Sequence, residues 1–270
     1  MTAQIDIVIP SRGPSPQRSA LLQDLDRELV GREDVCTISI EEGPSAARNR
    51  NRAAREQSAP WIAFLDDDIR LPPGWLDSVL QVTQLPDPPD IFSGTIGSTH
   101  PRNIFSMAAE DFVVRHKQYG DSWFLAGAMM VMNRDAFNIL NGFDESFSGA
   151  GGEDWRLCVM AHSAGMRIQV VPNLSCRHEN PRSMRDLMSR ARSYSATESP
   201  PSTHSSNDLS QSPSVGVNSP LPMRILRWPV REYRELRSRG RSRGRALAST
   251  VLYIPWMTSY LINARRSAKR

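Results

Sequence analysis

Cysteine is scarce in this chain, with three residues among 270. Cys36, Cys158 and Cys176 are odd in number and lack the spacing of metal-binding pairs, which argues against a disulfide framework and a cysteine metal site. We therefore expect reduced, packed thiols in a reducing compartment. The N-terminus also lacks the apolar region of a signal peptide, because it leads directly into a predicted strand, so we expect no export.

Two further features are missing. Residues 11–14 read Ser-Arg-Gly-Pro, so no glycine-rich phosphate loop follows the first predicted strand. The long apolar run at 246–262 has 17 residues and is interrupted by Pro255, whereas a membrane-spanning helix needs about 20 apolar residues. Basic residues also flank this run on both sides, which fits poorly with a single span.

Charge is unevenly divided along the chain. Residues 222–270 hold 13 Lys or Arg against 2 acids, a net charge of +11, whereas residues 1–221 hold 20 against 27, a net of −7. We expect an enzyme domain at 1–195, a disordered Ser- and Pro-rich linker at 196–222, and a basic, apolar helical tail at 223–270. The tail is typical of an interfacial segment drawn to anionic lipid. Its aromatic residues lie in the apolar run rather than in a basic groove, so we expect no nucleic acid partner.

Strands and helices alternate from the start of the chain. We predict strands at 5–10, 35–40, 61–65, 91–95, 124–132 and 167–171, and helices at 18–30, from 44, and at 74–84, 134–140, 153–163 and 183–195. This order implies right-handed crossovers and an α/β fold with a mostly parallel sheet flanked by helices. Residues 86–120 show little other periodicity, and acceptor-facing loops are expected there.

Three consecutive aspartates, Asp66, Asp67 and Asp68, follow the apolar run at 61–65. Five apolar residues in succession predict a strand covered on both faces, and ligands bind parallel sheets beyond the carboxyl ends of their strands. Crowded carboxylates repel one another unless a cation or hydrogen-bond donors compensate, and oxygen ligands suit a hard divalent ion such as Mg²⁺ or Mn²⁺. An acidic cap for the helix opened by residues 72–74 is the alternative interpretation.

Several motifs occur in a fixed order along the chain. They are GPSAARNR at 43–50, AARE at 53–56, FLDDD at 64–68, LPPGWL at 71–76, GFDESF at 142–147, GEDWRL at 152–157, AGMRI at 164–168, and His178. This series, over residues 5–195, resembles the nucleotide-sugar-dependent glycosyltransferases of family 2. The resemblance implies a GT-A-like, Rossmann-like fold and an inverting, metal-dependent transfer of a sugar to a hydroxyl acceptor.

The resemblance also assigns roles to the acids. Asp66 and Asp67 are expected to face the nucleotide sugar, and Asp68 is expected to ligate the metal together with His178. A bound Mn²⁺ or Mg²⁺ would offset the charge that grows on the diphosphate leaving group. A lone histidine with a structural role is the alternative for His178.

A second acidic pair, Glu153 and Asp154, follows the glycine-rich stretch 148–152 and opens a predicted helix. The resemblance makes Asp154 the favoured general base, which takes the proton of the acceptor hydroxyl, and Glu153 the residue that orients the acceptor. Acids at a helix start are also stabilised by the helix dipole, so a capping role holds equally well.

Nucleotide recognition is expected at the ends of the first two strands and on the second helix. By resemblance, the nucleotide-binding residues are Pro10, Ser11, Arg12, Glu41 or its neighbour Glu42, Arg48 and Asn49. Relatives commonly carry an aspartate-rich loop after the second strand, whereas here the two glutamates lead almost directly into Gly43. Arg50, Arg52 and Arg55 are interpreted as solvated charges on the helix face.

Three functional hypotheses follow from these patterns. The first is a glycosyltransferase that uses a nucleoside-diphosphate sugar and a glycan or lipid-linked acceptor, in cell-surface glycan or glycolipid assembly. It would be cytoplasmic and peripheral at the anionic inner face of the cell membrane. The second is a sugar-phosphate nucleotidyltransferase, although such chains carry a glycine-rich loop after the first strand. The third is a non-catalytic, membrane-docked adaptor, which would be expected to have lost acids from at least one site.

Overall fold

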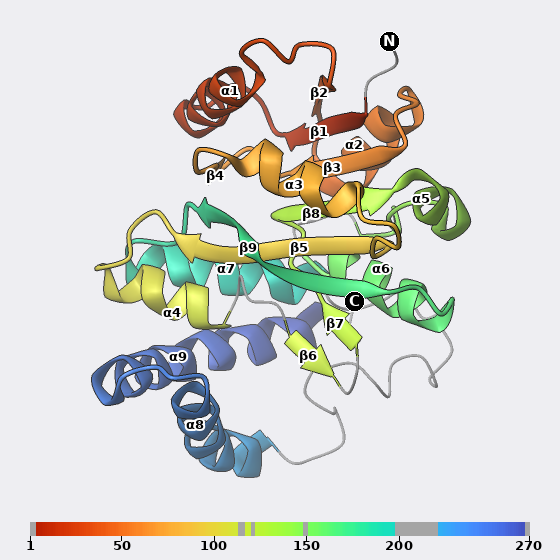
Figure 1. Cartoon of the computed structure of the whole chain (residues 1–270). Helices are drawn as coiled ribbons and strands as arrows, with labels where there is room; N and C mark the ends of the chain where they lie inside the picture. The colour runs from red at the N-terminus through yellow and green to blue at the C-terminus, as the bar shows by residue number, and fades with distance from the viewer. Residues whose placement is uncertain (1–3, 113–116, 120–121, 148–150, 198–220, 268–270) are drawn as a thin grey trace. The chain divides into compact units, whose positions relative to one another are not determined.

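The computed structural model describes residues 4–112, 117–119, 122–147, 151–197 and 221–267 (Figure 1). It divides into two compact units. The sheet unit comprises Met1–Thr99 and Val114–Glu179, and the helical unit comprises His100–Val113 and Asn180–Arg270. The chain therefore enters the helical unit twice, once for a short internal segment and once for its C-terminal part.

A seven-stranded sheet forms the centre of the sheet unit, in the order β2-β1-β3-β8-β5-β9-β4. Its strands are β1 (Ile5–Ser11), β2 (Cys36–Glu42), β3 (Trp61–Leu65), β4 (Ile69–Arg70), β5 (Ile91–Ser98), β8 (Met129–Asn133) and β9 (Ile168–His178). β1 pairs in parallel with β2 and β3, and β5 pairs in parallel with β9, whereas β8 and β4 run against their neighbours. The expected mostly parallel sheet is thereby confirmed.

Helices cover this sheet and bury its apolar strands. They are α1 (Pro16–Leu29), α2 (Ala46–Arg55), α3 (Trp75–Thr83), α5 (Arg134–Leu140) and α6 (Glu153–Ser163). Serine side chains cap α1 and α2, because the hydroxyls of Ser15 and Ser45 accept hydrogen bonds from backbone amides of the first turn. All of β1 is buried, and the small Ala47, Ala53 and Ala54 of α2 pack in the main core, as their size allows.

The predicted strand at 124–132 is wrong in one respect. The structure divides it into β7 (Ser122–Phe124), which pairs only with β6 (Lys117–Tyr119) among the described strands, and β8, with a loop between them. Leu125 and Ala128 of this loop are as buried as the strand residues, so the apolar run continues through the break. Hydrophobicity alone could not reveal it. All three cysteines are free and buried, and burial raises the pKa of Cys36 and of Cys158 to about 12.

Four helices make up the described part of the helical unit, namely α4 (Ile104–Phe112), α7 (Met184–Thr197), α8 (Leu221–Ser238) and α9 (Arg243–Ser267). Ala108, Ala109 and Phe112 of α4 pack with Leu187 of α7 and with apolar residues of α8 and α9. α4 lies within the segment 86–120, where we expected loops. The predicted linker at 196–222 falls outside the described residues except at its two ends.

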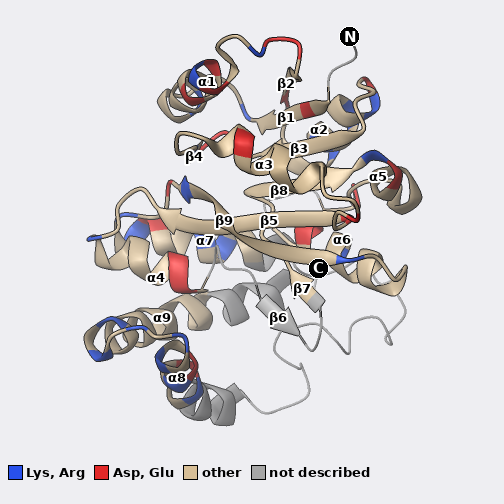
Figure 2. Cartoon of the chain, viewed as in Figure 1, with Lys and Arg blue, Asp and Glu red and all other residues tan. Residues whose placement is uncertain are grey.

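The helical tail is strongly basic, with 13 Lys or Arg against 2 acids over residues 222–270, and the coloured turns of α8 in Figure 2 carry blue together with some red. α9 continues through Pro255, so this proline does not end the helix. Within the described residues, we find no helix with both the length and the apolarity that a membrane crossing requires. Leu252 and Met257 of α9 are buried, whereas Leu247, Val251 and Ile254 are exposed.

A buried carboxylate anchors α9 to α4. The side chain of Asp111 accepts hydrogen bonds from Arg245 at 2.9 and 3.1 Å and from the hydroxyl of Ser249 at 2.8 Å. Arg241 lies 2.9 Å from the same carboxylate, and its guanidinium also reaches Glu110 at 3.2 Å. Two of the tail's basic residues are therefore neutralised inside the helical unit.

Candidate functional site

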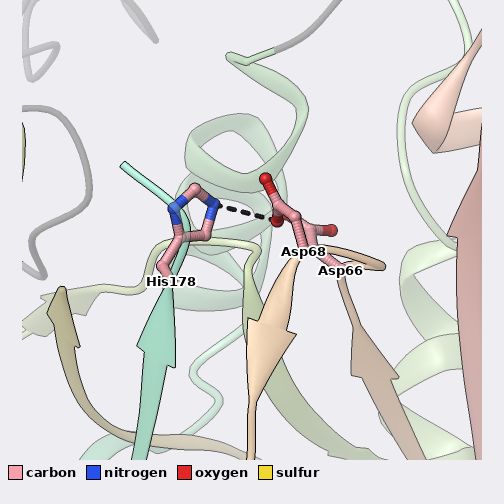
Figure 3. A group of neighbouring side chains, drawn as sticks. All are labelled: Asp66, Asp68 and His178. Carbon is pink, nitrogen blue, oxygen red and sulfur yellow. Dashed lines mark ion pairs between the residues drawn. The ribbon is translucent and has the colours of Figure 1, made fainter. Parts of the chain in front are cut away.

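The carboxyl end of β3 and the end of β9 bring Asp68 and His178 together. β4 begins directly after the aspartates and pairs with β9, so that Ile69 lies opposite His178. The backbone amide of Glu179 donates to the carbonyl of Asp68 at 3.0 Å, which fixes this pairing. Nε2 of the buried His178 then lies 3.2 Å from Oδ1 of Asp68 (Figure 3).

Asp66 joins this pair to form a group of potential metal ligands. One ligand atom from each of Asp66, Asp68 and His178 lies within 4.8 Å of the others. Ligands bound at about 2.1 Å from an ion lie up to about 4.2 Å apart, so the three side chains need only a small adjustment to enclose one. Two carboxylates and an imidazole form a donor set that suits Mn²⁺ well. The resemblance to family 2 predicts this role for Asp68 and His178, whereas it predicts that Asp66 faces the nucleotide sugar.

Burial sets the acidity of the first two aspartates. It raises the pKa of Asp66, the nearby guanidinium of Arg50 opposes the rise, and the charge of Asp68 adds to it. Burial likewise raises the pKa of Asp67, against the hydrogen bond that its Oδ2 accepts from Ser11 at 2.6 Å. Because burial disfavours the charged carboxylates, a cation bound beside them would stabilise their charged form strongly.

The second acidic pair occupies the first turn of α6. Gly152, at φ 98°, precedes it in a conformation that favours glycine, and it provides no side-chain cap. Oδ2 of Asp154 accepts a hydrogen bond from the backbone amide of Gly127 at 2.9 Å, and Oδ1 accepts one from the amide of Trp155 at 2.7 Å. A Cβ atom at position 127 would lie 3.2 Å from Cβ of Asp154, so glycine permits this close approach. The carboxylate is thus held in one orientation while remaining partly exposed.

Arg50 connects the two acidic groups, and its interpretation as a solvated charge is wrong. Its side chain is only 2% exposed. Nη2 donates to Oδ1 of Asp66 at 2.6 Å, and Nη1 donates to Oε1 of Glu153 at 2.8 Å. Burial would lower the pKa of Arg50, but the charges of Asp66 and Glu153 raise it above its ordinary value. The guanidinium therefore stays charged between two carboxylates.

The buried side of α2 could have been read from the sequence. Arg50 lies three residues after Ala47 and four before Ala54, which places it on the same helix face as the small core residues. Arg52 and Arg55 lie on the exposed side, as expected. The spacing of the alanines therefore indicated that position 50 is buried, although arginine side chains are usually exposed to solvent.

The residues expected to recognise the nucleotide separate into two groups. Buried positions are Pro10, Ser11, Glu41 and Asn49, and exposed positions are Arg12 and Arg48. The Asn49 amide donates to the carbonyls of Ser11 and Gly43 at 3.2 and 3.1 Å, so it braces the ends of β1 and β2. Glu41 forms an ion pair with Arg52, and the side chain of Arg48, 70% exposed, lies 3.5 Å from Glu145.

Arg18 of α1 lies beside the residues expected to bind the nucleotide, although the sequence did not indicate this position. Nη1 of Arg18 donates to the hydroxyl of Ser11 at 3.3 Å and to the carboxylate of Glu42 at 2.5 Å. With Asp67 on the other side of Ser11, these side chains form a polar cluster at the carboxyl ends of β1 and β3. The sequence around Arg18 does not predict this contact, because Arg18 lies in the first turn of a largely polar helix.

Comparisons with known proteins agree with this geometry. A family model described as "Glycosyltransferase like family 2" matches residues 16–194. The pre-mycofactocin glycosyltransferase of Mycobacterium tuberculosis (strain CDC 1551 / Oshkosh) is 28% identical over 174 residues, which cover 58% of this chain and 34% of that protein. The validoxylamine A glucosyltransferase of Streptomyces hygroscopicus subsp. jinggangensis is 28% identical over 159 residues, covering 47% and 37% respectively. The chain thus spans about a third of the length of these relatives.

A solved structure matches along nearly the whole chain. It is a mannosyltransferase from Pyrobaculum calidifontis in complex with GDP-Man and Mn²⁺, with a TM-score of 0.52 at 15% identity. The match covers 98% of this chain and 86% of that one. This likeness confirms the GT-A-like fold.

Proposed function

The chain belongs to glycosyltransferase-like family 2, and we propose that it is an inverting, metal-dependent glycosyltransferase. It transfers a sugar from a nucleoside-diphosphate sugar to a hydroxyl acceptor. The observation that carries this proposal is the convergence of two acidic groups, Asp66 with Asp68 and His178, and Glu153 with Asp154, which Arg50 connects. A bound Mn²⁺ or Mg²⁺ would neutralise the diphosphate as its charge grows.

The residues of the chain divide the remaining work. Asp154 accepts the proton of the acceptor hydroxyl at a carboxylate oxygen while that hydroxyl oxygen attacks the anomeric carbon. The bond from the anomeric carbon to the diphosphate oxygen breaks on the opposite face, so the configuration inverts. The amides of Gly127 and Trp155 hold the Asp154 carboxylate in place, which favours a productive approach. Glu153 orients the acceptor side of the site.

The cluster at the ends of β1 and β3 is suited to the nucleotide. Ser11, Arg18 and Asp67 offer donors and acceptors side by side, and a guanidinium binds phosphate or carbonyl oxygens well. We assign the base and ribose to this cluster and the diphosphate to the metal group beside it. A panel of nucleotide sugars, tested for hydrolysis with and without Mn²⁺, identifies the donor.

Replacement of Asp68 by Asn tests the metal assignment. We expect Asp68→Asn to abolish Mn²⁺-dependent binding of UDP or GDP, measured by calorimetry, while the fold is retained. Asp77→Asn is the matched control, because Asp77 is an exposed α3 residue that pairs with Arg32. Undiminished metal-dependent affinity in Asp68→Asn would remove Asp68 from the ligand set.

The two alternative functions receive less support. A sugar-phosphate nucleotidyltransferase is disfavoured by the family to which the chain belongs and by the single glycine after β1. A non-catalytic adaptor would be expected to have lost acids from one site, and here both acidic groups are present and ordered by hydrogen bonds.

We propose further that the tail holds the enzyme at an anionic membrane surface on the cytoplasmic side, where it acts on a lipid-linked or membrane-assembled glycan. The support is the net charge of +11 over residues 222–270, together with an exposed apolar stripe on α9 formed by Leu247, Val251 and Ile254. Basic residues near an anionic surface contribute about 1 kcal/mol each, and apolar side chains add to this.

Vesicle flotation of the full chain tests the location. We expect binding to vesicles that contain anionic phospholipid, weaker binding at high salt, and little binding to neutral vesicles. Truncation before the tail is a poor control, because it removes the α8 and α9 residues that cover α4. Equal binding to neutral and anionic vesicles, or a preference for duplex DNA, would contradict the membrane proposal.

A further inference from the structure

The guanidinium of Arg50 is shared between side chains to which the proposed function gives different tasks. Asp66 belongs to the metal group, formed with Asp68 and His178. Glu153 lies with Asp154 in the first turn of α6, which the proposed function assigns to the acceptor and which we call the acceptor side. Asp66 and Glu153 each receive a different terminal nitrogen of Arg50, and Nη2 also lies 3.4 Å from the carbonyl of Gly127. Because the guanidinium is planar and rigid, it fixes the separation of the two carboxylates.

The surroundings of Arg50 leave it little freedom to move. Its guanidinium carbon lies 5.0 Å from the ring centre of Phe143, and a Cβ atom at position 127 would come within 3.3 Å of Nη2. Among the described residues, Nε of Arg50 and Oε2 of Glu153 have no hydrogen-bond partner although both are buried. A purely structural ion pair is expected to satisfy such atoms, because an unpaired buried polar atom is costly.

We propose that Arg50 is a positioning residue that couples the metal group to the acceptor side. This inference rests on the proposed function, because it needs Asp66 to approach a cation. Arg50 divides its charge between Asp66 and Glu153. The stronger its interaction with Glu153, the less strongly Arg50 competes with a cation for Asp66. A change at Glu153 is therefore felt at the metal group, although Glu153 is not among its ligands.

Neighbouring acids on α6 provide a matched pair of variants. Glu153→Gln removes the charge that Arg50 contacts, and Arg50 then pairs with Asp66 alone and opposes Mn²⁺ binding. Asp154→Asn removes a charge one position away, where the carboxylate bonds to backbone amides instead of Arg50. We expect Glu153→Gln to weaken binding of Mn²⁺ alone about tenfold, and Asp154→Asn to change it much less.

The Arg50→Lys background completes the test. Lysine keeps the charge but cannot present two fixed donors, so Glu153→Gln should change Mn²⁺ affinity little in that background. Mn²⁺ binding to the full chain is followed by electron paramagnetic resonance, and circular dichroism verifies that each variant is folded. If Arg50→Lys does not fold, the comparison of Glu153→Gln with Asp154→Asn decides alone.

The outcomes separate this inference from the proposed function. Equal Mn²⁺ affinity in Glu153→Gln and Asp154→Asn overturns the coupling by Arg50, whereas the metal site stands if Asp68→Asn still abolishes binding. Wild-type protein that binds Mn²⁺ neither alone nor together with UDP or GDP overturns both, and where binding requires the nucleotide the variants are compared in its presence. An unchanged effect of Glu153→Gln in the Arg50→Lys background also overturns the coupling.

Discussion

The two units each contain a buried ion cluster, and the clusters are opposite in composition. In the sheet unit, Arg50 is shared by Asp66 and Glu153. In the helical unit, the carboxylate of Asp111 is shared by Arg241 and Arg245. The first cluster has one arginine for two carboxylates, whereas the charges of the second balance, because Arg241 and Arg245 also pair with Glu110.

The two clusters differ more clearly in how many of their buried polar atoms form hydrogen bonds than in their charge. Both oxygens of Asp111 are engaged, since Ser249 and Arg245 bond to Oδ2 and two arginines approach Oδ1. The cluster around Arg50 leaves buried atoms of Arg50 and Glu153 without hydrogen bonds within the described structure. A saturated cluster serves stability, whereas an unsaturated one at the end of a sheet is typical of a binding site.

Loss of Asp154 should produce the largest effect and should affect chemistry alone. We expect Asp154→Asn to slow sugar transfer about 10²- to 10⁴-fold, because the acceptor hydroxyl loses its base, while nucleotide binding persists. Single-turnover assays with the true acceptor measure this loss. Near-normal transfer would move the base role to another group, with Glu153 as the first candidate.

Loss of Asp111 should instead affect stability alone. Asp111→Asn replaces the buried carboxylate by an uncharged amide and leaves Glu110 to balance two arginines, so we expect the free energy of unfolding of the helical unit to fall by about 3 kcal/mol. Urea denaturation followed by circular dichroism measures this change. Glu110→Gln, at a more exposed position in the same cluster, is the control and should cost less. Slower transfer by the folded variant would contradict the contrast between the clusters.

Substitutions in the exposed stripe should act on location alone. Burial of apolar surface in the membrane is favourable by about 25 cal/mol per Å². The combined substitutions Leu247→Ser, Val251→Ser and Ile254→Ser remove that apolar surface, so they should reduce flotation with anionic vesicles about tenfold or more. Transfer to a water-soluble acceptor should be unchanged. A triple variant that floats like the wild type would assign binding to the basic residues by themselves.

The smallest effect is expected at Arg48. Its exposed pairing with Glu145 contributes less than about 1 kcal/mol, so Arg48→Ala should leave the denaturation midpoint almost unchanged. If Arg48 offsets phosphate charge, calorimetry should show a several-fold loss of affinity for a nucleoside diphosphate. Unchanged affinity would leave Arg18 as the principal cationic candidate in the nucleotide cluster.

The sequence predicted the elements that depend on local pattern. The run at 61–65 followed by acids predicted β3 and its site, and the small residues of α2 predicted close packing. The sequence did not predict α4, because its apolar face is explained only by helices far along the chain. The sequence also did not predict the break at 125–128, because the contact made there is with a distant segment. The amide of Gly127 in this loop donates to Asp154 of α6.

Arg50 shows the limit of residue-type reasoning at the site. An arginine on a helix is usually solvated, and only the positions of Asp66 and Glu153 in the fold make its burial affordable. Asp66 and Glu153 are separated from Arg50 by 16 and 103 positions, so no local pattern links all three.

The order in which the chain is synthesised gives the Asp111 cluster one more consequence. Asp111 leaves the ribosome 134 residues before Arg245, and 138 before Ser249. At about 5–20 residues per second, this delay is on the order of 10 s. During that interval α4 has neither its counter-ions nor the apolar residues of α8 and α9. We therefore expect the nascent chain to expose a binding site for chaperones at α4 until α9 has been translated.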